Sequence, residues 1–432
     1  MRAADWASLP PDCRRAMRSA VLAQCFGMLT QQMLTGGILL LYLNAMGVKA
    51  PVILLLLNLT PFLSSLLSIP VAWGTDCIGI KRFGNWGNSL MIAGMACIIA
   101  GAFLHGGAPR LVLPVVLVGL VIHLIGASFF NTGWFSLLSH IVPVTMTGRY
   151  FGLVRFSWQF MTLLFFSLSA LFFTSRTPLW IYQVVLAAGA VSVGCRFIFY
   201  RAIPDAPVTG STPLNMFGSV QSALVLPGFT RYLAYLLLLV CVTGNGQDMV
   251  RLSAVKGCGM GDNQVLYLSV ANMIGSLAAF RFMGRVVDYL GSRRMFLLCH
   301  IGFAVALLIF PARVALHLSP LAAGVASSAV LGLVASTLGL ATTSHSFRVC
   351  HGAQRTIAYA LVSAAQSLGS GLSGFALAAL LARFGSGLPV GNPFDVMLAG
   401  LGVCIFVQMA AVRLLHDPAE STETVYAATE VS

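Results

Sequence analysis

The chain has 432 residues, of which 58% are apolar and only 9% are charged, and its formal net charge is +13. Soluble domains contain roughly 45 to 50% apolar and about 25% charged residues. The composition therefore excludes an ordinary soluble protein and predicts an integral membrane protein. The positive net charge requires no nucleic-acid partner, because lysines and arginines at the ends of membrane spans set the topology and contact anionic headgroups of the lipid bilayer.

Twelve stretches of the chain are candidates for membrane spans, since crossing a bilayer takes about 20 mostly apolar residues. Each stretch ends at a charge, a Pro/Gly cluster or both. In chain order the expected spans are 19–46, 51–73, 85–105, 111–140, 152–175, 178–200, 231–255, 263–285, 295–316, 319–346, 357–382 and 394–415. The sequence thus predicts an all-α polytopic membrane protein with twelve transmembrane helices.

The spans divide into two sets of six. We expect an N-terminal bundle at 19–200 and a C-terminal bundle at 230–415, joined by a linker at 201–229 that is rich in Pro, Gly and Ser. Residues 1–18 and 416–432 flank the bundles. Basic residues are more numerous at the span ends that lie on the same side of the membrane as the N-terminus. The positive-inside rule therefore places both termini and the linker in the cytoplasm.

The ten cysteines are scattered without a CxxC pair, so we expect neither a disulfide framework nor a metal site, and no cofactor.

Two charged loops recur in equivalent places of the two halves. AWGTDCIGIKR (72–82) carries Asp76, Gly79, Lys81 and Arg82, and GRVVDYLGSRR (284–294) begins at Gly284 and carries Asp288, Gly291, Arg293 and Arg294. Arg149 follows the fourth span, and Arg355 follows the tenth in the same manner. Several residues of the first half thus recur in the second half at nearly the same separation along the sequence. This recurrence indicates an internal duplication and predicts two pseudo-symmetric bundles.

With this loop motif the sequence resembles the major facilitator superfamily over nearly its whole length. The second copy fits the family pattern well, whereas the first has Ala72 in place of Gly, and Cys77 and Tyr289 replace an Arg that often follows the Asp. The resemblance implies a secondary transporter of the bacterial inner membrane that works by alternating access and is not an enzyme. It also implies that the two loops clamp neighbouring helices in one conformational state.

The resemblance places the substrate site near the membrane midplane, between the halves, on the first, fourth, seventh and tenth spans. Polar or aromatic side chains in those spans are the candidates, and the TGNG stretch at 243–246 can interrupt the seventh helix. For single Ser and Thr residues we favour ordinary interhelical hydrogen bonds, worth about 0.6 kcal/mol each. The candidate substrate or coupling residues are Gln31, Gln32, Asn131, Trp134, Asn245, Gln247, Asp248 and Arg251.

Asp248 is the most informative candidate, because a carboxylate at the centre of a membrane helix costs roughly 2.5 to 3.5 kcal/mol on insertion scales. Arg251 follows at a spacing that allows pairing on one helix face. Two interpretations stay open: a self-neutralised pair that anchors the helix, or a carboxylate that takes up a proton or binds substrate, with Gln31 and Gln32 facing it. Arg155 is a further candidate, although it can also reach the cytoplasmic interface.

The substrate class is narrowed by what the fifth span lacks. It has no Pro, whereas drug/proton antiporters of the family usually carry a Gly-Pro-rich motif there, so a small polar organic solute is favoured, with protons as the candidate coupling ion. The alternatives are a drug or metabolite efflux carrier, a non-transporting sensor, and an integral-membrane enzyme that uses His140, His345 or His351.

Overall fold

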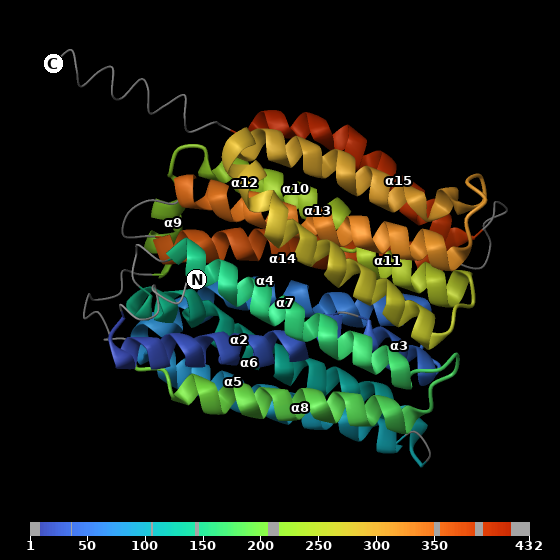
Figure 1. Ribbon diagram of the computed structural model, residues 1–432, viewed down its shortest axis with the longest axis horizontal. Helices are drawn as coiled ribbons and strands as arrows, with labels where there is room; N and C mark the ends of the chain where they lie inside the picture. Colours follow the sequence, from blue (N-terminus) through green and yellow to red (C-terminus); the bar gives the residue numbers. More distant parts are fainter. Residues whose placement is uncertain are drawn as a thin grey trace.

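The computed structural model describes residues 9–35, 37–104, 107–142, 147–205, 216–349, 355–384 and 392–415. The regular elements in these ranges are all helices, and the long ones run side by side in one bundle (Figure 1). Among the described residues, ten helices are long and apolar enough to cross a membrane, and a bent pair at the start of the chain makes an eleventh. The predicted all-α polytopic fold is confirmed.

The N-terminal half contains helices at all six of its expected spans. The first begins at Pro11 rather than at residue 19, and the third begins at Ile80 rather than at residue 85. Both helices continue beyond the apolar stretch because Arg and Lys are good helix formers. The helices are α2 (Pro11–Thr35), α3 (Ile38–Ala45), α4 (Ala50–Ile78), α5 (Ile80–Leu104), α6 (Pro109–Ile141), α7 (Thr147–Phe172) and α8 (Leu179–Arg201).

In the C-terminal half the eighth and ninth expected spans form one element, α12, and the ninth ends at Ile309 rather than at residue 316. The expected linker contains a helix, α9. The elements are α9 (Met216–Leu224), α10 (Phe229–Thr243), α11 (Gly246–Leu252), α12 (Asp262–Ile309), α13 (Pro320–Val349), α14 (Arg355–Phe384) and α15 (Pro393–Gln408), with short π or 3-10 turns at Ser253–Gly257, Pro311–Arg313 and Met409–Leu414.

The two motif loops bend at equivalent glycines. Gly79 follows α4 with φ 105° and ψ 140°, and Gly291 interrupts α12 with φ 75° and ψ 162°. This combination of angles is essentially restricted to glycine, because a Cβ would clash with the backbone. Both motif glycines therefore form tight turns, and their matching geometry supports the internal duplication.

The halves contact each other along two helix pairs. Gly371 and Gly374 of α14 pack on Phe62 and Asn58 of α4 so closely that a Cβ on either glycine would overlap its partner. In the second pair, Gln159 of α7 donates a hydrogen bond to the carbonyl oxygen of Met273 in α12 (3.4 Å). Small residues therefore allow close approach between the halves, as expected of helices that pack tightly in a membrane.

We call the end of the bundle opposite the start of α2 the far end; it carries α3 and α11 (Figure 1). There the Thr177 amide, in the α7–α8 connection, donates to Asp262 at the start of α12 (2.9 Å). The Asn263 amide donates to the Thr174 carbonyl oxygen (3.3 Å). Hydrogen bonds thus join the halves at this end.

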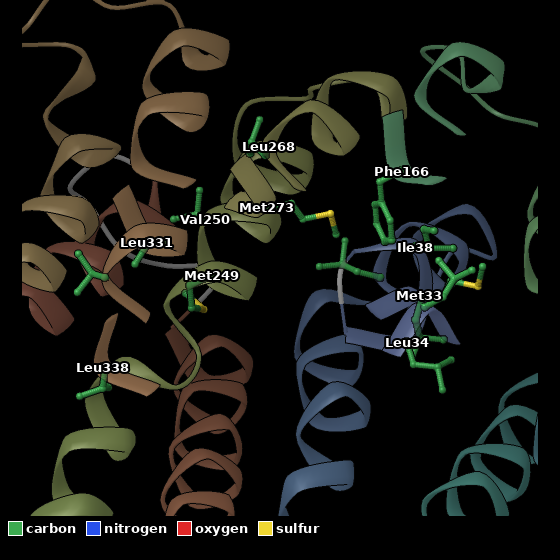
Figure 2. Packing of buried hydrophobic residues seen from close by; sticks show 14 of the residues in the cluster. Met33, Leu34, Ile38, Phe166, Met249, Val250, Leu268, Met273, Leu331 and Leu338 are labelled. Carbon is green, nitrogen blue, oxygen red and sulfur yellow. The ribbon is translucent and has the colours of Figure 1, made fainter. Parts of the chain in front are cut away.

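The apolar core is continuous across both halves. Figure 2 shows Met33, Leu34 and Ile38 around the α2–α3 break with Phe166 of α7 nearby, and residues of α11, α12 and α13 opposite them. The second group comprises Met249, Val250, Leu268, Met273, Leu331 and Leu338. The polar groups described next are therefore embedded in apolar packing.

Candidate functional site

An ion pair lies where the seventh span breaks. Arg251 Nη1 is 3.0 Å from Asp248 Oδ1, and the two side chains are 4% and 21% exposed. The pair forms because residues three apart share a helix face, here on the short helix α11. The predicted Asp248–Arg251 pairing is present, and Asp248 is the more accessible partner.

The same arginine reaches the other half of the protein. Arg251 Nη1 also donates to the carbonyl oxygen of Thr35 (2.9 Å), the last residue of α2. Carbonyl groups at a helix C-terminus lack helical partners and favour a nearby cation. The neighbouring Gly37 adopts φ 110°, and a Cβ there would lie 3.3 Å from Arg251 Nε. The break between α2 and α3, where the chain bends by 41°, therefore accommodates the guanidinium.

The TGNG stretch interrupts the seventh helix, as the sequence predicts. α10 ends at Thr243 and α11 begins at Gly246. Between them, Asn245 is buried, and its Nδ2 donates to the Ser370 carbonyl oxygen of α14 (2.9 Å). In this conformation Asn245 therefore holds the break against α14 within the same half, rather than facing a solute.

Gln247 belongs to a polar network within the C-terminal half. Its Nε2 donates to Ser328 Oγ (3.0 Å), and its Oε1 accepts from Asn272 Nδ2 (3.2 Å). Asn272 Nδ2 also donates to the Ser328 carbonyl oxygen (3.2 Å). Sequence inspection missed Asn272 and Ser328, although an Asn inside a span is a usable signal. The network links α11, α12 and α13 at the level of the break.

The glutamines of the first span lie one turn before the α2–α3 break. Gln31 and Thr35 are exposed and share a helix face, and Thr35 Oγ1 donates to the Gln31 carbonyl oxygen (3.0 Å). Gln32 is half-buried. Neither glutamine side chain hydrogen-bonds Asp248 in this conformation, so a direct contact between them stays a prediction.

The candidates of the fourth span have different surroundings. Trp134 is buried against Phe130 (ring centroids 5.2 Å apart) and Tyr200 (6.5 Å), which makes it a packing residue here. Asn131 is exposed, and its Oδ1 accepts from Arg196 Nη2 of α8 at 3.5 Å. Sequence inspection missed Arg196. The available signal was a basic residue more than one turn inside the sixth span.

Arg155 lies between the halves near the start of α7. It is half-buried, its Nη2 is 3.4 Å from Thr343 Oγ1 of α13, and its Cζ lies 5.9 Å from the centre of the Phe280 ring. The side chains of Arg149 and Arg355 lie outside the described part of the structure. Arg155 is thus a contact between halves at the end opposite Arg251.

The loop motif is described only in part. Lys81 Nζ donates to the carbonyl oxygens of Tyr200 and Ile203 (2.6 Å each) at the end of α8, so it caps that helix C-terminus. Arg82, Arg293 and Arg294 are exposed. The side chains of Asp76 and Asp288 lie outside the described part of the structure, and the predicted clamp stays a prediction.

Among the described residues, no group of three or more His, Cys, Asp or Glu could hold a metal ion.

No protein-family model and no curated protein matches the sequence. Solved structures do share its fold. A POT family transporter in complex with a thioalcohol-conjugated peptide aligns with TM-score 0.72 and 11% identity over 93% of this chain and 96% of its own. A D-xylose–proton symporter aligns with TM-score 0.68 and 14% identity over 94% and 98% of the two chains. A mutant form of the nucleoside transporter NupG aligns with TM-score 0.69 and 11% identity over 93% and 100%.

These likenesses establish the fold, which this chain shares with the three structures. They confirm the architecture that the resemblance to the major facilitator superfamily predicted from the sequence.

Proposed function

We propose that this chain is a secondary transporter that carries a small polar organic solute across a membrane by alternating access, with protons as the coupling ion. Its fold is shared with proteins described as peptide, D-xylose and nucleoside transporters. The Arg251 side chain of α11 meets the backbone end of α2 at Thr35, where the first and seventh spans are both interrupted, and interrupted helices are the arrangement that transporters use to bind substrates and ions.

The observation that carries the proposal is the contact of Arg251 with Thr35. It joins the halves at the far end by a hydrogen bond from a charged donor (2.9 Å), in addition to the contacts of Thr177 with Asp262 and of Asn263 with Thr174. A hydrogen bond to a charged group contributes about 1.5 to 3 kcal/mol, an amount that a conformational transition can overcome. Alternating access requires such contacts, because each end must close firmly and still open.

Asp248 is the coupling residue in this proposal. Its carboxylate holds Arg251 by an ion pair while its side chain remains 21% exposed. Protonation would remove the negative charge and weaken the hold on the guanidinium that reaches Thr35. Proton uptake would thereby change the stability of the far-end closure. Exposed Gln31, one turn from Thr35, is in reach of a polar solute on the same face of α2.

We further propose a location in the bacterial inner membrane with both termini in the cytoplasm, so that the far end is extracytoplasmic. Gly107, in the α5–α6 connection, is exposed, and a Cβ added there would meet no atom within 4 Å. In a background without native cysteines, a Cys at Gly107 should react with a membrane-impermeant maleimide from outside the cell. Reaction only after the cells are opened would reverse the topology.

Purified protein tests the transport function. A ligand at 100 times its dissociation constant adds about 2.7 kcal/mol of stability, so a thermal-shift screen of polar solutes identifies a ligand. Proteoliposomes preloaded with that ligand should then show counterflow of the labelled form. Stabilisation without counterflow would indicate a sensor, and chemical conversion of the ligand would indicate an enzyme. Either result would overturn the proposal.

A further inference from the structure

Arg196 is a cation buried inside the N-terminal half, and the transport scheme above does not use it. It lies in α8 and is 6% exposed. The ion pairs formed by the described residues are Asp248 with Arg251 and Asp395 with Arg313. Arg196 therefore has no carboxylate partner in the part of the chain that the structure describes.

The neighbours of the guanidinium are neutral. Its Cζ lies 3.3 Å from the centre of the Phe130 ring, Nη2 is 3.5 Å from Asn131 Oδ1, and Nη1 is 3.7 Å from Met91 Sδ. A Cβ on Gly27 of α2 would approach within 2.6 Å of the guanidinium. Residues of α2, α5 and α6 thus surround this group of α8.

These contacts leave the charge uncompensated. Buried Arg196 Nε has no hydrogen-bond partner, and the contact to Asn131 is long for a hydrogen bond. An aromatic ring can stack on the guanidinium face while the N–H groups at its edge stay free for a planar anion. Because charge inside a membrane is expensive and usually marks a site for a substrate or an ion, the unpaired guanidinium indicates a site for an anion.

Arg196 has an accessible neighbour on one side. Asn131 is exposed, whereas Ser128 and Leu124, one and two turns earlier on the same face of α6, are buried. The exposed Asn131 is therefore the side of Arg196 from which a solute can approach, and rotation of its amide would present the NH₂ group as a donor.

We propose that Arg196 and Asn131 bind the carboxylate of the transported solute, so that the substrate is an organic monocarboxylate. This inference rests on the proposed transport function. Arg196 supplies one positive charge, which a carboxylate neutralises in a low-dielectric site, whereas a phosphate dianion would leave a net negative charge. A bidentate pair with a carboxylate would satisfy the N–H groups of Arg196 that lack a strong acceptor, and Asn131 would donate to the carboxylate as it enters.

Binding is measured by thermal shift on purified full-length protein. The probes are L-lactate, D-gluconate and D-glucuronate, each beside a neutral counterpart (L-lactamide or D-glucose), with inorganic phosphate as a further anion. The variant is Arg196→Gln. Its control is Arg201→Gln, which removes the same charge from an exposed position of the same helix. We expect at least one carboxylate, and no neutral counterpart, to stabilise the parent and the control. The affinity of Arg196→Gln for that carboxylate should be weaker than that of the parent by about tenfold or more.

A second variant separates binding from folding. Arg196→Met removes an unpaired buried charge and keeps an apolar stem, so its ligand-free melting temperature should equal or exceed that of the parent. A lower melting temperature would assign Arg196 a structural role. No stabilisation by any carboxylate, equal stabilisation of Arg196→Gln, or stabilisation by phosphate alone would overturn the site. Carboxylate binding without counterflow would refute transport and leave the site standing.

Discussion

Removing the Arg251 link should open the far end of the bundle. The informative change is the double variant Asp248→Asn/Arg251→Met, because Asp248→Asn alone keeps the hydrogen bond from Arg251 to Thr35, and Arg251→Met alone would leave the Asp248 carboxylate unpaired. The double variant removes the hydrogen bond from Arg251 to the Thr35 carbonyl oxygen (2.9 Å). At about 1.5 to 3 kcal/mol for a hydrogen bond to a charged group, the ratio of open to closed molecules should rise by roughly 10-fold to 150-fold.

Distances between spin labels measure this ratio. Lys49 of the N-terminal half and Lys256 of the C-terminal half are exposed on either side of the far end, and labelled cysteines at both positions, without native cysteines, report opening. The matched control is Asp395→Asn/Arg313→Met, since that ion pair (2.8 Å) lies within one half. We expect a longer distance population only in the Asp248/Arg251 variant. Identical distributions in parent, variant and control would refute the reasoning.

Three further predictions follow from the backbone and the loops. Gly374→Ala forces a methyl group into Asn58 and should cost about 1 to 3 kcal/mol, so its melting temperature should fall, whereas Gly400→Ala, with open space around it, should melt no lower than the parent. Gly291→Ala, at φ 75°, should cost about 1 to 3 kcal/mol; an unchanged melting temperature would argue against the tight turn. Asp288→Asn should shift the distances between spin labels at the end opposite the far end while the bundle stays folded, and Asp76→Asn should shift them less. Unchanged distances in both variants would refute the clamp hypothesis.

Much of the fold was predictable because membrane insertion imposes strong local rules. Apolar length fixes a helix at each span, and the loop glycines were identified from their positions in a repeated motif. Helix ends were predicted less well. α2 begins at Pro11 and α5 at Ile80, since hydropathy reports the apolar stretch and polar residues can extend a helix beyond it.

The site was predictable only where its geometry is local. Asp248 and Arg251 lie three residues apart, so their pairing follows from helix periodicity. The contact with Thr35 depends on how two helices from different halves pack, and periodicity carries no information about it. Arg196 was missed for the same reason, since its isolation from carboxylates is a property of the neighbours that α2, α5 and α6 bring to it.

The most direct test of the central claim is transport by proteoliposomes under an imposed pH gradient, with the ligand identified by thermal shift. Parent protein should accumulate the solute against its concentration gradient when protons flow inward. Asp248→Asn should lose this accumulation and still exchange labelled for unlabelled solute, because Asn retains the shape and an acceptor oxygen but cannot take up a proton. Accumulation by Asp248→Asn equal to that of the parent at every pH would contradict the coupling role, and absence of exchange by the parent would contradict transport itself.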